Sequence, residues 1–158
     1  MLTITVEDSA FRAYLQELQS RLGDLTPVMD EIGNDLENRI RQRFETRTDP
    51  SGAPWHPWAQ STLESYPFPG SESATRSKYG PGNARLLDRY GTMLGGLNYQ
   101  ADHTSVRVGF DQLYAAYHEF GTKHMPRRSL LFADPDAGTL TPGDERLVIE
   151  LLQEWLAP

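Results

Sequence analysis

The hydrophobic positions in the N-terminal third of the chain follow first a strand period and then a helix period. Apolar and polar residues alternate over residues 2–6, which indicates a short half-buried strand. Apolar residues then recur at three- and four-residue steps over residues 9–23 and 27–46, which predicts two amphipathic helices. Thr26-Pro27 is a helix-start signal, because threonine can cap a helix and proline suits its first turn. The second helix would be about 30 Å long at 1.5 Å per residue.

The C-terminal half predicts shorter elements around a small sheet. Residues 86–96 predict a short helix, and residues 98–101 and 104–110 predict a hairpin joined at residues 102–103. A further short helix over 113–120 ends at a glycine, residues 129–133 predict a strand, and Thr141-Pro142 begins a last amphipathic helix. The sequence therefore predicts an α+β fold, with long N-terminal helices and a C-terminal helix packed on a small, mostly antiparallel sheet.

Residues 49–83 form a segment of different composition, with six prolines and four glycines. Such density excludes a long helix or a central strand, so we expect a long loop within a single domain spanning residues 1–158. Two tryptophans lie in its first half. Trp55 is held between prolines and is expected in the core, whereas Trp58 is expected at the margin of the subunit. The part over 67–83, rich in serine and glycine, is expected to become ordered only on binding.

Composition and charge exclude several classes of protein. Cysteine is absent, which excludes a disulfide scaffold and a thiol nucleophile, and no apolar run is long enough to span a membrane. The start of the chain lacks the basic and apolar regions of a signal peptide, so none is expected. The net charge is −7 and unevenly spread: residues 1–38 hold two arginines against eight acids, and residues 130–158 hold one arginine against six. An acidic chain gains little from the counterion release that drives nucleic-acid binding.

Four arginines at the end of the second helix are the chain's basic cluster. Arg39, Arg43 and Arg47 are spaced one helical turn apart and would form a row. Cations at a helix C-terminus complement the helix dipole, so the row can be a solvated face. It can also be a face that forms salt bridges with another protein, or one that contacts DNA. These three interpretations remain open from the sequence.

No constellation of residues predicts catalysis. His118-Glu119 begins like a zinc-protease helix, but Thr122 stands where that motif needs its second histidine. Nucleophile-elbow, P-loop and dinucleotide-binding glycine patterns do not occur. We therefore expect no enzymatic activity, no catalytic residue, no metal and no cofactor.

Three fragments, in order, carry a resemblance to a known family. The first runs over residues 49–62 and reads DPSGAPWHPW followed by Ser61-Thr62; the second is Leu86-Leu87-x3-Gly91-x2-Leu94. The third begins at Val106-x-Val108-Gly109 and continues as YA-x-x-HEFGT over 114–122 and MPRRSLL over 125–131. Together they resemble the phage virion morphogenesis (tail completion) family of Mu-like and related tailed phages. Glu119 departs from the pattern, since the family tends to have glutamine there.

The resemblance implies a structural virion protein without enzymatic activity, acting in tail completion and head–tail joining. It implies a homo-oligomeric ring, most simply a hexamer matching a tail tube, that contacts neighbouring neck and tail proteins. DNA would pass through the lumen without specific binding, because an acidic lining repels phosphates. The expected location is the head–tail junction of the virion, reached from the host cytoplasm during assembly. The alternatives are a head-side adaptor ring of twelve copies, or a DNA-binding module that uses the row of arginines.

Aromatic and charged residues near the third fragment are the expected contact surface. Three-residue spacing puts two tyrosines and a phenylalanine on one face of the helix over 113–120, followed by a basic loop. In a ring, identical subunits meet head to tail, and a basic loop would complement the acidic ends of the chain. The residues expected at interfaces are Arg39, Arg43, Arg47, Trp58, Tyr114, Tyr117, His118, Lys123, Arg127 and Arg128.

Overall fold

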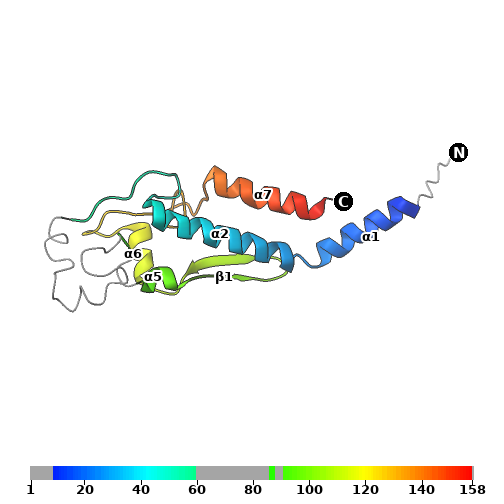
Figure 1. The fold of residues 1–158 in the computed structure, drawn as a ribbon, viewed down its shortest axis with the longest axis horizontal. Coiled ribbons are helices and arrows are strands. Elements are labelled where there is room, and N and C mark those ends of the chain that lie inside the picture. The colour runs from blue at the N-terminus through cyan, green and yellow to red at the C-terminus, as the bar shows by residue number, and fades with distance from the viewer. Residues whose placement is uncertain (1–8, 60–85, 88–90, 158) are drawn as a thin grey trace.

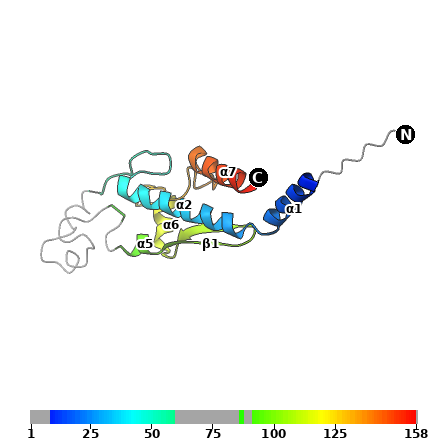
Figure 2. The ribbon, with the colours of Figure 1, turned by 45° about the vertical axis from the view of Figure 1, so that its right-hand side comes forward.

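The computed structural model of the chain describes residues 9–59, 86–87 and 91–157. The described elements lie in three layers, with α2 between a two-stranded sheet and α7 (Figures 1 and 2). The α+β class and the antiparallel sheet are confirmed. The strand expected over 2–6 and the loop residues 60–83 lie outside the described residues. The elements are α1 (Ser9–Gly23), α2 (Thr26–Thr46), α5 (Thr92–Gly95), β1 (Leu97–Ala101), β2 (Val106–Phe110), α6 (Tyr114–Phe120) and α7 (Pro142–Leu156).

Helix α2 organises the molecule and runs along the sheet (Figure 1). Its proline lies in the first turn, as the sequence predicts, but the N-cap position is Leu25 and not Thr26, and no side chain caps the helix. The helix ends where Arg47 adopts a left-handed conformation with φ 59°. The buried side of α2 includes Val28, Ile32, Ile40 and Phe44. The last two enter the main core, together with residues from the segments that follow α2 up to residue 131. That core consists of Ile40, Phe44, Trp55, Met93, Leu94, Leu97, Ala115 and Leu130.

The first part of the Pro/Gly-rich segment is packed against this core. Trp55 is buried, and its ring meets Phe44 edge-on with 5.3 Å between the ring centroids. Trp58 is half-buried, so the different positions expected for the two tryptophans are confirmed. Before them, the Asp49 carboxylate accepts hydrogen bonds from the backbone N–H groups of Ser51 and Ala53, which closes a tight turn.

The sheet formed by the described residues is a hairpin in which β1 pairs with β2. Leu97 lies opposite Phe110, and Tyr99 lies opposite Val108. The second strand starts at residue 106 and not at 104 as expected. The reason is the Asp102 carboxylate, which accepts hydrogen bonds from the backbone N–H groups of residues 104 and 105 and so draws them into the turn. These bonds hold the pKa of Asp102 well below its ordinary value.

The other two long helices do not cover the sheet. Helix α7 packs on the side of α2 that faces away from the hairpin, and α1 extends beyond the N-terminal end of α2 (Figures 1 and 2). The start of α7 is capped as predicted, because the Thr141 hydroxyl accepts a hydrogen bond from the Asp144 N–H at 3.1 Å. Within the part that the structure describes, no helix is both long enough and apolar enough to cross a membrane.

Two predicted elements need correction. The helix expected over 86–96 is observed only as α5, since Leu87 has a φ of 66°, which is incompatible with a right-handed helix. Residues 129–133 are not a strand. The N–H groups of residues 130–132 bond to a side chain and not to a neighbouring strand, and the Ala133 N–H donates to the Thr139 carbonyl.

Candidate assembly interface

Helix α6 presents a buried side to the core and an apolar side to solvent. Ala115 and Glu119, one turn apart, are its buried residues. On the outer side Leu113, Tyr117 and Phe120 are 88 %, 57 % and 50 % exposed. Tyr114, at the margin of this side, is also exposed. No other described part of the subunit covers this outer side, so its large apolar side chains remain exposed to water. Such a cluster marks an interaction surface more often than a packing accident.

A groove lies beside this apolar side of α6. Its volume is about 310 Å³, and it is lined by the end of β2, by α6 and by residues 130–132. Phe110, Phe120 and Phe132 contribute to its walls, and most of the exposed lining is apolar. The groove and the outer side of α6 together form one surface, which we call the α6 face: residues 109–117, 119, 120 and 130–132.

The loop after α6 adds positive charge next to this face. Gly121 ends the helix with a φ of 72°, and a side chain there would approach the Arg127 backbone to 3.1 Å. The chain therefore needs glycine at this turn. Lys123 and His124 are exposed at the tip of the turn. Arg127 is exposed as well and forms an ion pair of 2.6 Å with Asp136. An exposed pair of this kind contributes little stability and leaves the guanidinium accessible.

Arg128 differs from its neighbour because it lies inside the subunit. Its Nε donates to the carbonyl of His56 at 2.8 Å, and its guanidinium also donates to the carbonyl of Pro57 at 2.9 Å. In return, the Trp55 indole N–H donates to the carbonyl of Ser129 at 2.9 Å. These bonds join the start of the Pro/Gly-rich segment to the segment after α6. The structure thus gives Arg128 a role in the fold.

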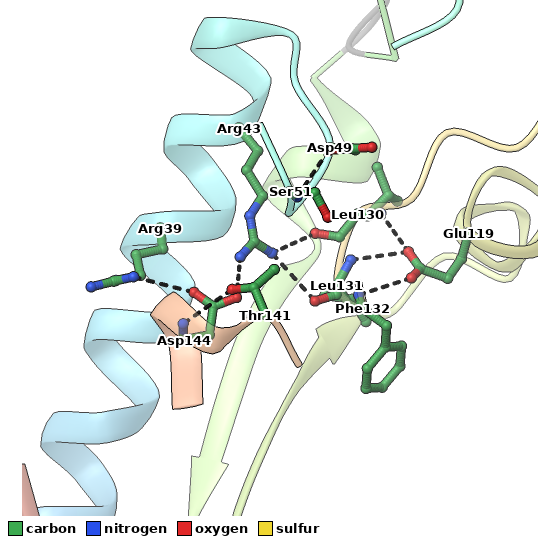
Figure 3. A network of polar contacts seen from close by, with 10 residues as sticks. All are labelled: Arg39, Arg43, Asp49, Ser51, Glu119, Leu130, Leu131, Phe132, Thr141 and Asp144. Carbon is green, nitrogen blue, oxygen red and sulfur yellow. Dashed lines mark hydrogen bonds and ion pairs between the residues drawn. The ribbon is translucent and has the colours of Figure 1, made fainter. Parts of the chain in front are cut away.

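Glu119 and Arg43 hold residues 130–132 from two sides, as Figure 3 shows. The Glu119 carboxylate accepts hydrogen bonds from the backbone N–H groups of Leu130, Leu131 and Phe132, at 2.5, 3.0 and 3.0 Å. The guanidinium of Arg43 donates to the carbonyls of Leu130 and Leu131, at 2.8 and 3.4 Å. This pair of charged side chains replaces a strand partner and fixes one wall of the groove.

Asp144 links the same network to helix α7. Its side chain is 2 % exposed and receives Arg43 at 2.5 Å and Arg39 at 3.3 Å (Figure 3). Arg43 is therefore buried among partners of its own subunit, and the arginines do not form one exposed row. Arg39 is partly exposed at the edge of this network, and Arg47 is exposed at the end of α2. The Asp144 carboxylate therefore links α7 to α2. Removing one partner of this buried ion pair would leave the other charge buried and unpaired, which costs far more free energy than the pair contributes.

His118 is half-buried between the α6 face and the interior. Its Nδ1 is buried and has no hydrogen-bond partner within the described residues. Burial, and secondarily the charge of Arg128, lowers the pKa of His118 below its ordinary value. Folding therefore favours the neutral form of this imidazole. Among the described residues, no group of three or more histidines or acids is placed to hold a metal ion.

The expected contact residues near α6 and in the core thus divide into three groups, which are exposed, partly buried and internal. Tyr114, Tyr117, Lys123 and Arg127 are exposed together on or beside the α6 face, while Trp58 and His118 lie partly buried at the margins of the subunit. The arginines at 43 and 128 are internal. Sequence reasoning missed Leu113, the groove, and the internal role of Glu119. The signal for the internal role of Glu119 was that a glutamate stands where the family tends to have glutamine.

Comparison with known proteins places the chain in a family. No curated protein and no solved structure matches it. One family model does match, and it covers residues 6–157, which is nearly the whole chain. The chain belongs to the phage virion morphogenesis family.

Proposed function

We propose that this chain is a ring-forming tail-completion protein that joins the head and tail of a phage particle at the neck. Membership of the family gives the coarser statement: the chain has a structural role in phage virion morphogenesis and not a catalytic one. A ring, its position at the head–tail junction and its contacts with neck and tail proteins are the proposal. The ring would be a hexamer, with DNA passing through it unbound.

The α6 face is the observation that carries the proposal. Three large apolar side chains, Leu113, Tyr117 and Phe120, are half or more exposed next to an apolar groove. Lys123 and Arg127 add positive charge beside them, whereas the outer side of α7 carries the exposed acids Glu145 and Glu150. One copy thus carries the exposed cations Lys123 and Arg127 on one surface and the exposed acids of α7, interspersed with Arg146, on another. A head-to-tail contact between identical subunits can bring such groups together.

The DNA-binding alternative loses support from the structure. It needs Arg39, Arg43 and Arg47 as one exposed basic row, but Arg43 is buried and paired with Asp144. Arg39 shares the same carboxylate. The remaining exposed arginine at the end of α2 does not provide the run of phosphate contacts that counterion release requires.

Deletion of the gene from its phage or prophage, followed by electron microscopy of the lysate, tests the proposal. We expect filled heads and tails that are not joined, and restoration of joined particles when the chain is supplied from a plasmid. Reconstruction of the restored particles then counts the copies: six support the tail-side ring, and twelve support the head-side adaptor. Normal joined particles in the absence of the chain would overturn the proposal.

A further inference from the structure

We propose that helix α1 of one copy packs on the α6 face of a second copy. This inference rests on the proposed ring and names the two surfaces that would meet in it. It is carried by three features: the sparse packing of α1 within its own subunit, the apolar groove beside α6, and the placement of the two at opposite ends of α2.

Helix α1 is poorly covered by its own subunit. It extends away from the body beyond the start of α2 (Figures 1 and 2). It is attached to the end of α7, where Tyr14 and Leu18 line a pocket with Leu156 and Ala157, and it is also attached through Arg21. That guanidinium donates to the carbonyls of Trp155, at 2.8 Å, and Ala157 at the end of α7. Tyr14 and Leu22 remain 38 % and 54 % exposed. An isolated helix of 15 residues is marginal in water, so α1 needs further apolar contact to be stable.

The α6 face fits such a helix. The large apolar side chains of Tyr14 and Leu22 remain exposed on α1, and they lie about two helical turns apart on one side of the helix, as anchors do in helix-in-groove recognition. The groove of about 310 Å³ has room for the side chains of such anchors and offers a mostly apolar lining. Tyr117 and Phe120 would flank the bound helix, because both project from α6 into solvent.

A second copy is the occupant because the two surfaces cannot meet within one subunit. Helix α6 packs near the C-terminal end of α2, whereas α1 continues from its N-terminal end (Figures 1 and 2). Charge supports the same pairing. The junction of α1 and α2 carries exposed Asp24, Asp30 and Glu31, and the rim of the α6 face carries Lys123 and Arg127. Such a contact is heterologous, so repetition closes a ring or extends a filament.

The absence of cysteine makes cross-linking between copies a clean test. One chain would carry Tyr14→Cys or Leu22→Cys, and a second chain, with a different tag, Tyr117→Cys or Phe120→Cys. After mixing, a short bis-maleimide cross-linker should join the two tags in at least one of the four combinations. Arg107→Cys, on the exposed outer side of the sheet, is the matched control and should give no cross-link with either α1 position.

Self-association of the same chains is measured in parallel by sedimentation velocity. Leu22→Asp should weaken self-association by about tenfold or more, with little change in the thermal midpoint of the subunit, because this side chain is more than half exposed. Oligomers that form without any α1–α6 cross-link would overturn this inference and leave the proposed ring standing. A chain that stays monomeric under all conditions, including in restored particles, would overturn both.

Discussion

The carboxylate of Glu119 receives three successive backbone N–H groups, from residues 130–132. In a β-strand, successive N–H groups point to opposite sides, so they cannot converge on one carboxylate. This convergence explains why the apolar run after Ser129 is not a strand. The Arg43 guanidinium, which can only donate hydrogen bonds, donates to two carbonyls on the other side of the segment. One residue of each charge thus determines the local backbone.

Glu119→Gln should destabilise the subunit, although an amide has nearly the same shape. One amide oxygen can still accept from two N–H groups, but the amide nitrogen then faces the third N–H group as a second donor. Loss of a charged hydrogen bond and one unsatisfied buried donor should lower the free energy of unfolding by about 1–3 kcal/mol. Urea denaturation measures this change. A variant as stable as the wild-type chain would show that the three bonds contribute nothing.

The lowered pKa of His118 predicts that the stability of the subunit depends on pH. This pKa is lowered in the folded subunit by burial and by Arg128, so the unfolded chain binds a proton more readily. Stability is therefore complete above the unfolded pKa of about 6.5 and falls as the pH drops from there toward the folded pKa. His118→Phe should lose less stability than wild type between about pH 7.5 and pH 5.5. Denaturation midpoints at the two pH values test this, with His124→Phe, at an exposed site, as the control.

At the scale of elements, local signals were enough to predict the long helices, although not the extent of α5. Thr26-Pro27 and Thr141-Pro142 mark the starts of α2 and α7, and apolar spacing gives their buried sides. Local signals do not specify which layers meet, so the position of α7 across α2 from the sheet was not predicted. For the same reason, the prediction that Arg43 belongs to an exposed row of arginines was wrong. The partner of Arg43, Asp144, is 101 residues away in sequence, and no periodicity within α2 can show that pairing.

The candidate interface likewise combines features that local spacing predicts with features that depend on contacts distant in sequence. Three-residue spacing was sufficient to place Tyr114 and Tyr117 on an exposed side of α6. The groove beside them needs Phe110 and residues 130–132, which come together only in the folded chain. Arg127 and Arg128 are adjacent and chemically identical, yet one is exposed and one is buried. Only the carbonyls of His56 and Pro57, distant in sequence, distinguish them.

Two glycines in helices predict opposite effects of the same substitution. A Cβ at Gly33 would lie 2.3 Å from the Tyr99 ring, which is also held by its hydroxyl bond to Asp30. Gly33→Ala should therefore separate α2 from β1 and cost about 1–3 kcal/mol, despite the better helix propensity of alanine. At Gly143 the nearest atoms would be 3.8 Å away, so Gly143→Ala should be neutral or stabilising by up to about 1 kcal/mol. Thermal and urea denaturation of both variants check the signs, and a stable Gly33→Ala would show that the two layers can move apart.

At the scale of the whole molecule, the structure separates charges that maintain the fold from charges available to partners. Arg43 and Arg128 are buried and bind groups of their own subunit, whereas Lys123 and Arg127 remain exposed beside the α6 face. This distinction decides which charges can be reversed in a test of assembly. A charge reversal that includes Arg128 would remove its bonds to two backbone carbonyls and damage the subunit, so it cannot report on assembly.

Lys123→Glu combined with Arg127→Glu should block assembly while leaving the subunit folded. Both side chains are exposed, and the ion pair of Arg127 with Asp136 contributes about 0–1 kcal/mol, so the thermal midpoint should change little. The reversed charges would meet the acidic surface of the adjoining copy, where like charges repel and set the wrong register. Arg128→Glu is the matched comparison and should lower stability by about 2 kcal/mol or more, through unsatisfied buried carbonyls and a buried charge. Thermal melting monitored by circular dichroism, together with restoration of joined particles in the deleted phage, separates the two effects. If the double variant is folded and still restores particles, the basic loop does not contact another subunit.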